Sequence, residues 1–114
     1  MEVKETKDFK KDFKKLAKHY PSLKNDLEVL VMALKADPTG NGARHWNILK
    51  THEEHYILKV RMMCRSVKGK SFRVIYYYDG ACLELECIEI YYKALKQRED
   101  QERIETFWKQ RVSI

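Results

Sequence analysis

Six basic residues follow one another in the middle of the chain with no acidic residue between them. Between positions 55 and 78 the side chains that are charged at neutral pH are Lys59, Arg61, Arg65, Lys68, Lys70 and Arg73. Neighbouring like charges repel one another, so a surface that gathers them is typical of a site that binds an anion. Tyrosines accompany these cations, and both tyrosine and arginine stack on nucleobases. The pattern favours RNA as the ligand, with a merely solvated basic surface as the alternative.

Strand alternation predicts which of these cations share a face. In residues 55–65 the even positions are nearly all apolar and should face a core: Tyr56, Leu58, Val60, Met62 and Cys64. The odd positions place Lys59, Arg61 and Arg65 on the opposite face, spaced by about 7 Å along the strand.

The next strand, residues 72–78, adds to this basic face. If Phe72 and Val74 pack inward, then Arg73 and Tyr77 project beside the first three cations.

The last strand, residues 81–92, follows a predicted Asp79-Gly80 turn and ends at two tyrosines and Lys93. Its alternation changes sense near Cys87, which predicts a bulge or bend there. The pattern alone leaves open whether Tyr91 or Tyr92 faces the basic surface.

Two amphipathic helices should precede the strands. The first has Thr6 as its N-cap and ends at Tyr20 because Pro21 follows. Its apolar stripe consists of Phe9, Phe13, Leu16 and Tyr20. The second starts after Ser22, and Asp37 and Pro38 end it. Its stripe consists of Leu23, Leu27, Leu30, Val31 and Leu34. The two helices should form a hairpin that needs a third surface to cover both stripes.

The predicted order is two helices, four strands and one helix. The strands are expected at 46–50, 55–65, 72–78 and 81–92, and the last helix at about 94–111. This order predicts one α+β domain over residues 1–114, in which a helical hairpin covers one face of a four-stranded antiparallel sheet. The other face should be open.

Three segments in this order resemble the RelE/ParE toxin superfamily. They are Tyr56–Arg61 (YILKVR), Phe72–Tyr76 (FRVIY) and Ile90–Lys93 (IYYK), all after a two-helix start. Within the superfamily the pattern is similar to the RelE and HigB branch. The resemblance covers residues 6–98.

The resemblance implies the toxin of a type II toxin–antitoxin system, a ribosome-dependent mRNA endonuclease that inhibits translation. By position, Lys59 matches the base, Arg73 the phosphate stabiliser, Lys93 the general acid and Arg61 a supporting phosphate ligand. The other predicted RNA contacts are Arg65, Lys68, Lys70, Tyr77, Tyr91 and Tyr92. The implied reaction is a metal-free attack of the 2′-hydroxyl on the RNA backbone, which needs a base, a cation at phosphorus and an acid. Neighbouring positive charges favour the neutral, basic form of a lysine.

Two other functions stay open. A ParE-like gyrase inhibitor has the same fold and no nuclease chemistry, and an inactive member could keep only RNA binding. The chain departs from the compact RelE pattern in its long 62–71 loop and in the absence of an aromatic residue from 94 to 103. The histidines near the first strand are predicted to be ordinary polar surface, with an acid or base role as the alternative: His45, His52 and His55.

Composition restricts the class of protein further. The 114 residues carry a net charge of +6. No apolar run reaches the length of a membrane span, and the charged N-terminus does not resemble a signal peptide. We therefore expect a cytoplasmic protein with no membrane partner, no cofactor and no metal, whose partners are an antitoxin, the ribosome and mRNA. Cys64, Cys82 and Cys87 are expected to be reduced and buried.

Overall fold

A computed structural model describes residues 1–69 and 71–112 of the chain. The elements are β1 (Glu2–Glu5), α1 (Lys7–Ala17), α2 (Leu23–Ala36), the 3-10 turn η1 (Gly40–Gly42), β2 (Trp46–His52), β3 (His55–Met62), β4 (Phe72–Asp79), β5 (Glu84–Tyr92) and α3 (Gln101–Arg111). No helix within the described ranges has the length and apolarity that crossing a membrane requires.

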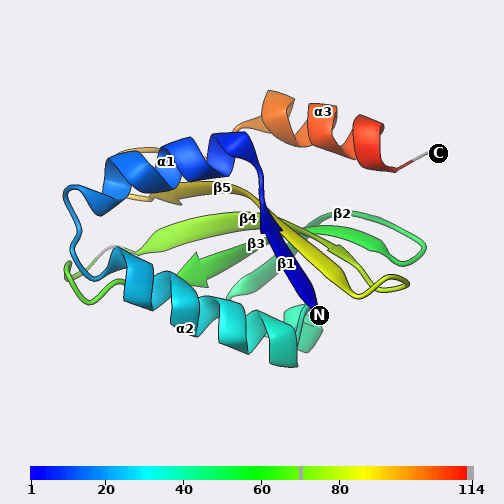
Figure 1. Ribbon diagram of the computed structural model, residues 1–114, viewed down its shortest axis with the longest axis horizontal. Coiled ribbons are helices and arrows are strands. Elements are labelled where there is room, and N and C mark those ends of the chain that lie inside the picture. Colours follow the sequence, from blue (N-terminus) through cyan, green and yellow to red (C-terminus); the bar gives the residue numbers. More distant parts are fainter. Residues whose placement is uncertain (70, 113–114) are drawn as a thin grey trace.

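The protein has the predicted α+β class, but its sheet is five-stranded and mixed (Figure 1). The order is β1-β5-β4-β3-β2, and β1 runs parallel to β5 while the other neighbours are antiparallel. The expectation of four antiparallel strands is therefore wrong in this detail. The extra strand, EVKE, has a single apolar residue and so gives no alternation signal. It is held by backbone pairing and by an ion pair of 3.0 Å between Lys4 and Glu84.

The helical hairpin covers one face of the sheet, as predicted (Figure 1). Thr6 caps α1, and its hydroxyl accepts a hydrogen bond of 3.1 Å from the amide of Phe9. Helix α1 ends at Ala17, before the expected Tyr20, although the Tyr20 ring still packs on Phe72 at a centroid distance of 5.2 Å. The main core between hairpin and sheet contains Phe9, Leu23, Leu27, Leu30, Leu34, Leu58, Val60, Met62, Cys64, Phe72, Val74, Tyr76, Leu85, Cys87 and Ile90. The inward residues of β3 and β4 are those that alternation predicts.

The opposite face of the sheet is only partly open, which corrects the expectation that it is bare. Helix α3 lies across this face and buries a second cluster: Ile57, Ile75, Tyr77, Ile88, Tyr91, Ile104, Phe107, Trp108 and Val112. The helix starts at Gln101 rather than near 94 because the Asp100 carboxylate caps it and accepts a bond of 3.1 Å from the amide of Arg103. The preceding residues, 93–100, form turns that we call the strap.

The turn between β4 and β5 starts at the predicted Asp79. One oxygen of its carboxylate accepts hydrogen bonds from the amides of Ala81 and Cys82, at 2.9 and 3.2 Å. The turn delays the start of the last strand relative to the sequence prediction. It also exposes Cys82, whereas Cys64 and Cys87 are buried free thiols as expected.

Candidate nucleic-acid interface

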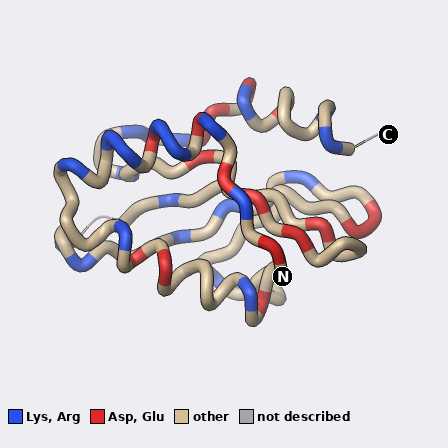
Figure 2. Tube along the Cα trace, in the orientation of Figure 1, with Lys and Arg blue, Asp and Glu red and all other residues tan. Residues whose placement is uncertain are grey.

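Neighbouring strands of the sheet carry Lys and Arg residues (Figure 2), and two arginines among them form the centre of the basic surface. Arg61 of β3 and Arg73 of β4 are cross-strand partners, as alternation predicts. The hydroxyl of Ser71 accepts a hydrogen bond from Nε of Arg61 at 3.1 Å and from Nη1 of Arg73 at 2.5 Å. Ser71 is buried, and its hydroxyl fixes the positions of both guanidinium groups. Within the described residues neither arginine, which we call the arginine pair, forms an ion pair with a carboxylate.

Lys59 lies on the same face, two residues before Arg61, but its charge is compensated. Its Nζ lies 3.0 Å from Oε1 of Glu99, a strap residue whose side chain is only 8% exposed. The phenol of Tyr91 donates a second bond of 3.3 Å to the same oxygen. Burial disfavours the ionised form of Glu99, but the bonds from Lys59 and Tyr91 outweigh it and lower the pKa of this carboxyl below its ordinary value of 4.5. The basic face is therefore not free of acids.

Glu99 was not found from the sequence. Residues 94–111 read as one helix, and in a charged helix a single glutamate at position 99 carries no signal. The available clue was Asp100, because aspartate is a favoured N-cap residue. A helix that starts directly after Asp100 leaves Glu99 outside it.

A buried glutamate anchors the strap. Glu89 of β5 has an exposed fraction of 0% and accepts bonds from Nζ of Lys96 at 2.6 Å and from the amide of Asp100 at 2.9 Å. Burying a carboxylate is costly unless it is paired and hydrogen-bonded, and here the middle and the end of the strap supply the partners. The strap is thereby fixed in the position from which Glu99 reaches Lys59.

A bulge in β5 decides which terminal tyrosine faces the basic surface. Ile75 pairs with Glu89 and Tyr76 with Cys87, so Ile88 is the extra residue near the predicted position. Tyr91 consequently lies on the α3 face opposite Arg73, and burial raises its pKa.

Neither Tyr92 nor Tyr77 presents its ring beside the arginine pair. The Tyr92 ring stacks on Phe72 at 4.8 Å beneath the hairpin, on the face opposite the arginine pair. Tyr77 is covered by Phe107 of α3, and its hydroxyl lies 2.7 Å from Nδ1 of His55. Burial raises the pKa of Tyr77 to about 12. Phe107 therefore covers the Tyr77 ring, and the partly buried Tyr92 belongs to the hairpin side of the sheet.

Lys93 reaches the edge of the arginine pair. Its amide donates to the carbonyl of Ser71 at 3.1 Å, which joins the end of β5 to the segment that holds both arginines. Its ammonium group donates to the carbonyl of Gln97 within the strap. Lys93 is thus close to the centre, with its charge turned toward the strap.

The remaining predicted RNA contacts do not join this centre. Arg65 follows the end of β3 and binds Asp26 of α2, with 3.3 Å between Nε and Oδ1, so it belongs to the hairpin side. Lys68 is exposed on the 62–71 loop, and Lys70 lies outside the described residues. The structure therefore gathers Lys59, Arg61, Arg73, Tyr91 and Lys93, and separates Arg65, Tyr77 and Tyr92 from them.

The histidines show no catalytic arrangement with the arginine pair. His55 contacts Tyr77 and lies 3.9 Å from Asp79, at the far end of the sheet. His52 lies 3.8 Å from Glu53. His45 contributes its backbone carbonyl, which accepts a bond of 3.1 Å from the amide of Arg61. The described residues bring no three His, Cys, Asp or Glu side chains together as metal ligands.

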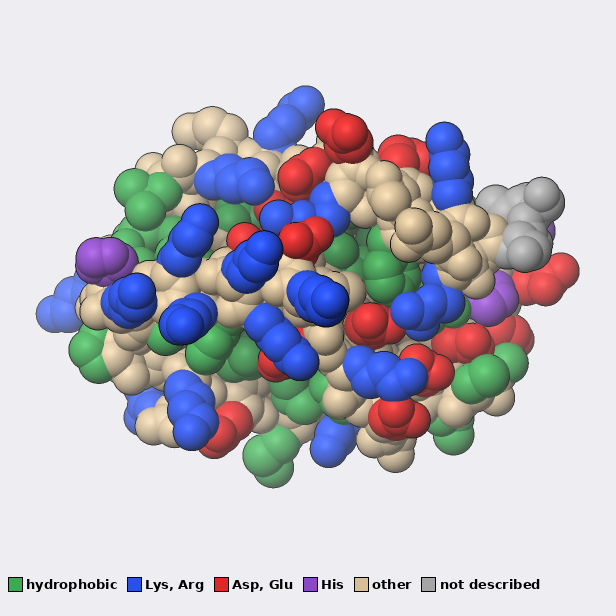
Figure 3. Space-filling view, turned by 45° about the horizontal axis from the view of Figure 1, so that its top comes forward, with side chains coloured by type: hydrophobic (Ala, Val, Ile, Leu, Met, Phe, Trp, Pro, Cys, Tyr) green, Lys and Arg blue, Asp and Glu red, His purple; other side chains and the backbone are tan. Residues whose placement is uncertain are grey.

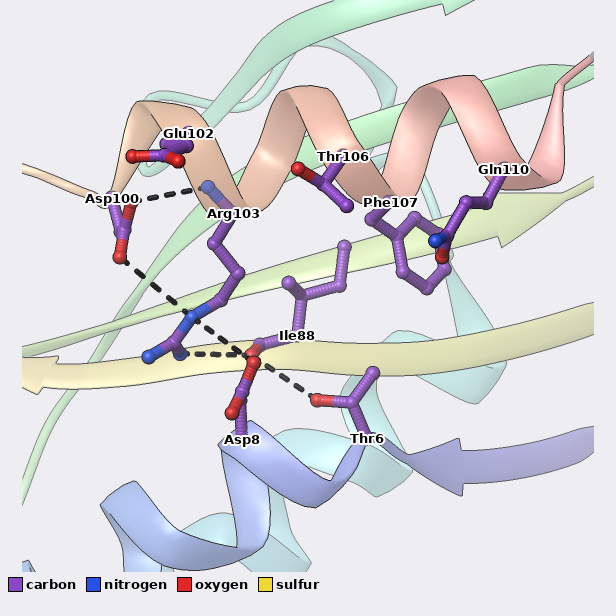
Figure 4. A pocket seen from close by; sticks show the side chains of 9 residues that line it. All are labelled: Thr6, Asp8, Ile88, Asp100, Glu102, Arg103, Thr106, Phe107 and Gln110. Carbon is purple, nitrogen blue, oxygen red and sulfur yellow. Dashed lines mark hydrogen bonds and ion pairs between the residues drawn. The ribbon is translucent and has the colours of Figure 1, made fainter.

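A cleft of about 450 Å³ lies between the start of α1 and α3 (Figure 4). Arg103 projects into it and is 2.7 Å from a carboxylate oxygen of Asp12 and 3.8 Å from one of Asp8. Its Nη1 also donates to the carbonyl of Ile88 at 3.2 Å. These ion pairs join α1 to α3. Because the two acids balance the charge of Arg103, this arginine is not free to bind a phosphate.

Comparison with known proteins identifies no relative. The chain matches no protein-family model, no curated protein and no solved structure. The resemblance to the RelE/ParE superfamily therefore stays a prediction from three sequence motifs.

Proposed function

We propose that the protein is a RelE-like toxin that binds mRNA on the α3 face of its sheet and cleaves it on the ribosome. The observation that carries the proposal is the arginine pair: two guanidinium groups held side by side on one buried hydroxyl, without a carboxylate partner among the described residues, beside Lys59. Two positive charges directly opposite one another on neighbouring strands repel and destabilise the folded protein. A phosphate between the two groups would remove that cost.

The arginine pair has donors to spare. Each guanidinium carries five N–H donors, and Ser71 uses one from each. Arginine binds phosphate through two parallel hydrogen bonds, so both residues can hold the scissile phosphate while Ser71 fixes their orientation. Fixed donors aimed at developing negative charge are the usual source of stabilisation for a phosphorane.

The proposed reaction moves two protons, one from the 2′-hydroxyl to the base and one from the acid to the leaving 5′-oxygen. The base takes the proton of the 2′-hydroxyl, the 2′-oxygen forms a bond to phosphorus, and the bond from phosphorus to the 5′-oxygen breaks. An acid protonates that 5′-oxygen, which leaves a 2′,3′-cyclic phosphate and a 5′-hydroxyl. We assign the base to Lys59, charge stabilisation to Arg73 with Arg61, and the acid to Lys93.

The bond between Lys59 and Glu99 means that the described arrangement is a resting one. The carboxylate of Glu99 lies 3.0 Å from Nζ of Lys59 and so occupies the position that the 2′-hydroxyl of RNA would need. RNA binding would therefore displace Glu99 before cleavage, because phosphate and carboxylate compete for the same cations. Displacement leaves the Lys59 amine beside Arg61 with no carboxylate on it, free to contact the 2′-hydroxyl.

The same bond also favours a second candidate, a non-enzymatic member of the fold. If Glu99 remains on Lys59, the face keeps two free arginines and can bind nucleic acid or gyrase without a base. A ParE-like inhibitor of gyrase and an inactive RNA-binding protein both fit that description. In each of the three cases we expect a cytoplasmic antitoxin that covers the arginine pair with acidic residues.

A translation extract supplied with the purified protein tests the proposal. Mapping of mRNA 5′ ends should show new ends within translated codons, and these ends should carry a 5′-hydroxyl. Intact mRNA together with inhibited gyrase supercoiling would favour the ParE-like alternative. Intact mRNA with normal supercoiling would leave the inactive RNA-binding protein.

A further inference from the structure

The outer surface of α1 is a second basic surface, separate from the arginine pair. Five lysines of α1 and its C-cap, Lys18, are exposed and belong to the row of blue side chains in Figure 3: Lys7, Lys10, Lys11, Lys14, Lys15 and Lys18. We call them the α1 lysines. Within residues 1–69 and 71–112 none of them forms an ion pair.

The acids of α1 do not compensate these lysines. The helix contains two, Asp8 and Asp12, and both contact Arg103 of α3. Both negative charges of the helix therefore lie beside Arg103, although Asp8 is itself exposed, and neither forms an ion pair with the lysine row.

This arrangement is unfavourable for an isolated helix. Lysines four positions apart, such as Lys7 with Lys11 and Lys14 with Lys18, are neighbours on the helix surface and repel one another. Lys7 also stands in the first turn, where the helix dipole disfavours a cation. A bound polyanion would relieve both effects, whereas water and dilute salt only screen them.

We propose that the α1 lysines dock on the phosphate backbone of a nucleic-acid duplex. From Lys7 to Lys18 the row extends over about 16 Å at the helical rise of about 1.5 Å per residue, long enough to contact several successive phosphates. Lysine acts on phosphate as a point charge and does not read bases. The surface has no exposed arginine, asparagine, glutamine or aromatic residue between positions 7 and 18. Recognition is therefore of the duplex backbone, without sequence preference.

An anionic membrane fits this helix less well. Binding in a membrane interface requires an apolar face that enters the lipid. The apolar residues of α1, Phe9, Phe13 and Leu16, pack on the sheet instead. Nothing on the outer surface of the helix is left to insert.

Docking on a duplex is independent of cleavage. The arginine pair is on the other side of the sheet from the hairpin, so the two surfaces can hold different parts of one RNA. Failure of one proposal leaves the other intact, because duplex affinity and mRNA cleavage are measured separately.

The test measures binding of the full chain to labelled blunt RNA and DNA duplexes by fluorescence anisotropy over a range of salt concentrations. The variant Lys10→Gln/Lys14→Gln/Lys18→Gln is compared with Lys24→Gln/Lys35→Gln/Lys109→Gln, which removes the same charge from exposed positions on α2 and α3. We expect the α1 variant to lose about tenfold or more in affinity, and its salt slope to fall by about 2 to 3, since each neutralised phosphate contributes about 0.9. The control variant should lose less than about threefold.

A second variant, Lys7→Gln/Lys11→Gln/Lys15→Gln, protects the test against an effect of one substitution set on folding. Both α1 variants should melt at or above the wild-type temperature, because each removes repulsion. The more tightly bound duplex, RNA or DNA, identifies the natural source of phosphates. Equal losses in α1 and control variants would overturn the proposal, as would tight binding to anionic vesicles or an acidic peptide without binding to either duplex.

Discussion

The arginine pair and the α1 lysines are both basic, but their neighbours differ. Arg61 and Arg73 are held at defined positions by Ser71, and the adjacent Lys59 is held by Glu99. The α1 lysines have no such partners in the described structure and extend freely into solvent. A fixed pair of planar groups can stabilise one geometry of a phosphate, whereas flexible point charges bind any backbone. Charge alone therefore does not distinguish a site for chemistry from a docking surface, but the contacts of each cation do.

The largest expected effect is on the packing of α3 against the sheet. Phe107 anchors α3 on the sheet, and Phe107→Ala should lower the free energy of unfolding by about 3 kcal/mol through lost burial and a cavity. Because the strap leads directly into α3, mRNA cleavage should fall while duplex binding by α1 is retained. Thermal or urea unfolding measures the first effect.

Leu95→Ala is the matched control for that change. Leu95 is 75% exposed on the strap, so its loss should alter stability by no more than about 0.5 kcal/mol. Equal destabilisation by the two substitutions would show that α3 does not cover the sheet as described.

Lys59→Ala should lower the rate of mRNA cleavage by about 10²-fold, the usual contribution of a general base. Lys59 is half-buried on a strand position that points away from the main core, so the fold should be retained. The rate is measured from the appearance of new mRNA 5′ ends. Lys50→Ala removes a β2 lysine that is paired with Glu105 of α3, and it should leave the rate unchanged. An active Lys59→Ala protein would assign the base elsewhere.

Glu99→Gln should make the arginine pair and Lys59 bind single-stranded RNA about fivefold more tightly. A carboxylate in an ion pair competes with phosphate by up to about 1 kcal/mol, which corresponds to that factor. Anisotropy with a short single-stranded RNA measures it. Unchanged or weaker binding would mean that Glu99 positions Lys59 and does not compete with the ligand.

The same variant predicts a pH dependence. The pKa of Glu99 is lower in the folded protein than its ordinary value of 4.5, so the unfolded chain takes up this proton first as the pH falls. The contribution of the Lys59–Glu99 bond to stability is therefore complete above pH 4.5 and is lost as the pH falls through the lower, folded value. At neutral pH the melting temperature of the wild type should exceed that of Glu99→Gln by the contribution of this bond. The two melting temperatures should converge as the pH falls through the folded pKa of Glu99.

The smallest effect is expected for Arg65→Ala. Arg65 is bound to Asp26 on the hairpin side, and its side chain is 71% exposed. Its removal should change mRNA cleavage by less than about twofold and stability by no more than about 1 kcal/mol. A loss of cleavage comparable to that of Lys59→Ala would place Arg65 in the site and refute the separation of the two sides of the sheet.

The sequence predicted the positions on the strands more reliably than the elements around them. Alternation placed Lys59, Arg61 and Arg73 on one face because a side-chain period of two is a property of the strand itself. It also located the bulge near Cys87, although only the pairing register could show that Tyr91 and not Tyr92 faces the cations.

The parts that were missed depend on contacts between segments far apart in the chain. Strand β1 is charged and exists because the edge of β5 offers backbone partners. Glu99 reaches Lys59 across 40 positions, since the buried Glu89 holds the strap in place. The residue pattern of a short segment predicts neither the pairing of β1 with β5 nor the contact between Glu99 and Lys59. The compensation of a basic cluster by a distant acid is therefore a structural observation.

Arg73→Ala tests the central claim most directly, because this residue belongs to the arginine pair and to no ion pair among the described residues. The measurement is mRNA cleavage in a translation extract, with thermal unfolding of the same preparation and Arg44→Ala, an exposed arginine on a loop, as the matched control. We expect Arg73→Ala to reduce cleavage by about 10²-fold or more with an unchanged melting temperature, and Arg44→Ala to behave as wild type. Full cleavage by Arg73→Ala at equal concentration would contradict the proposed site.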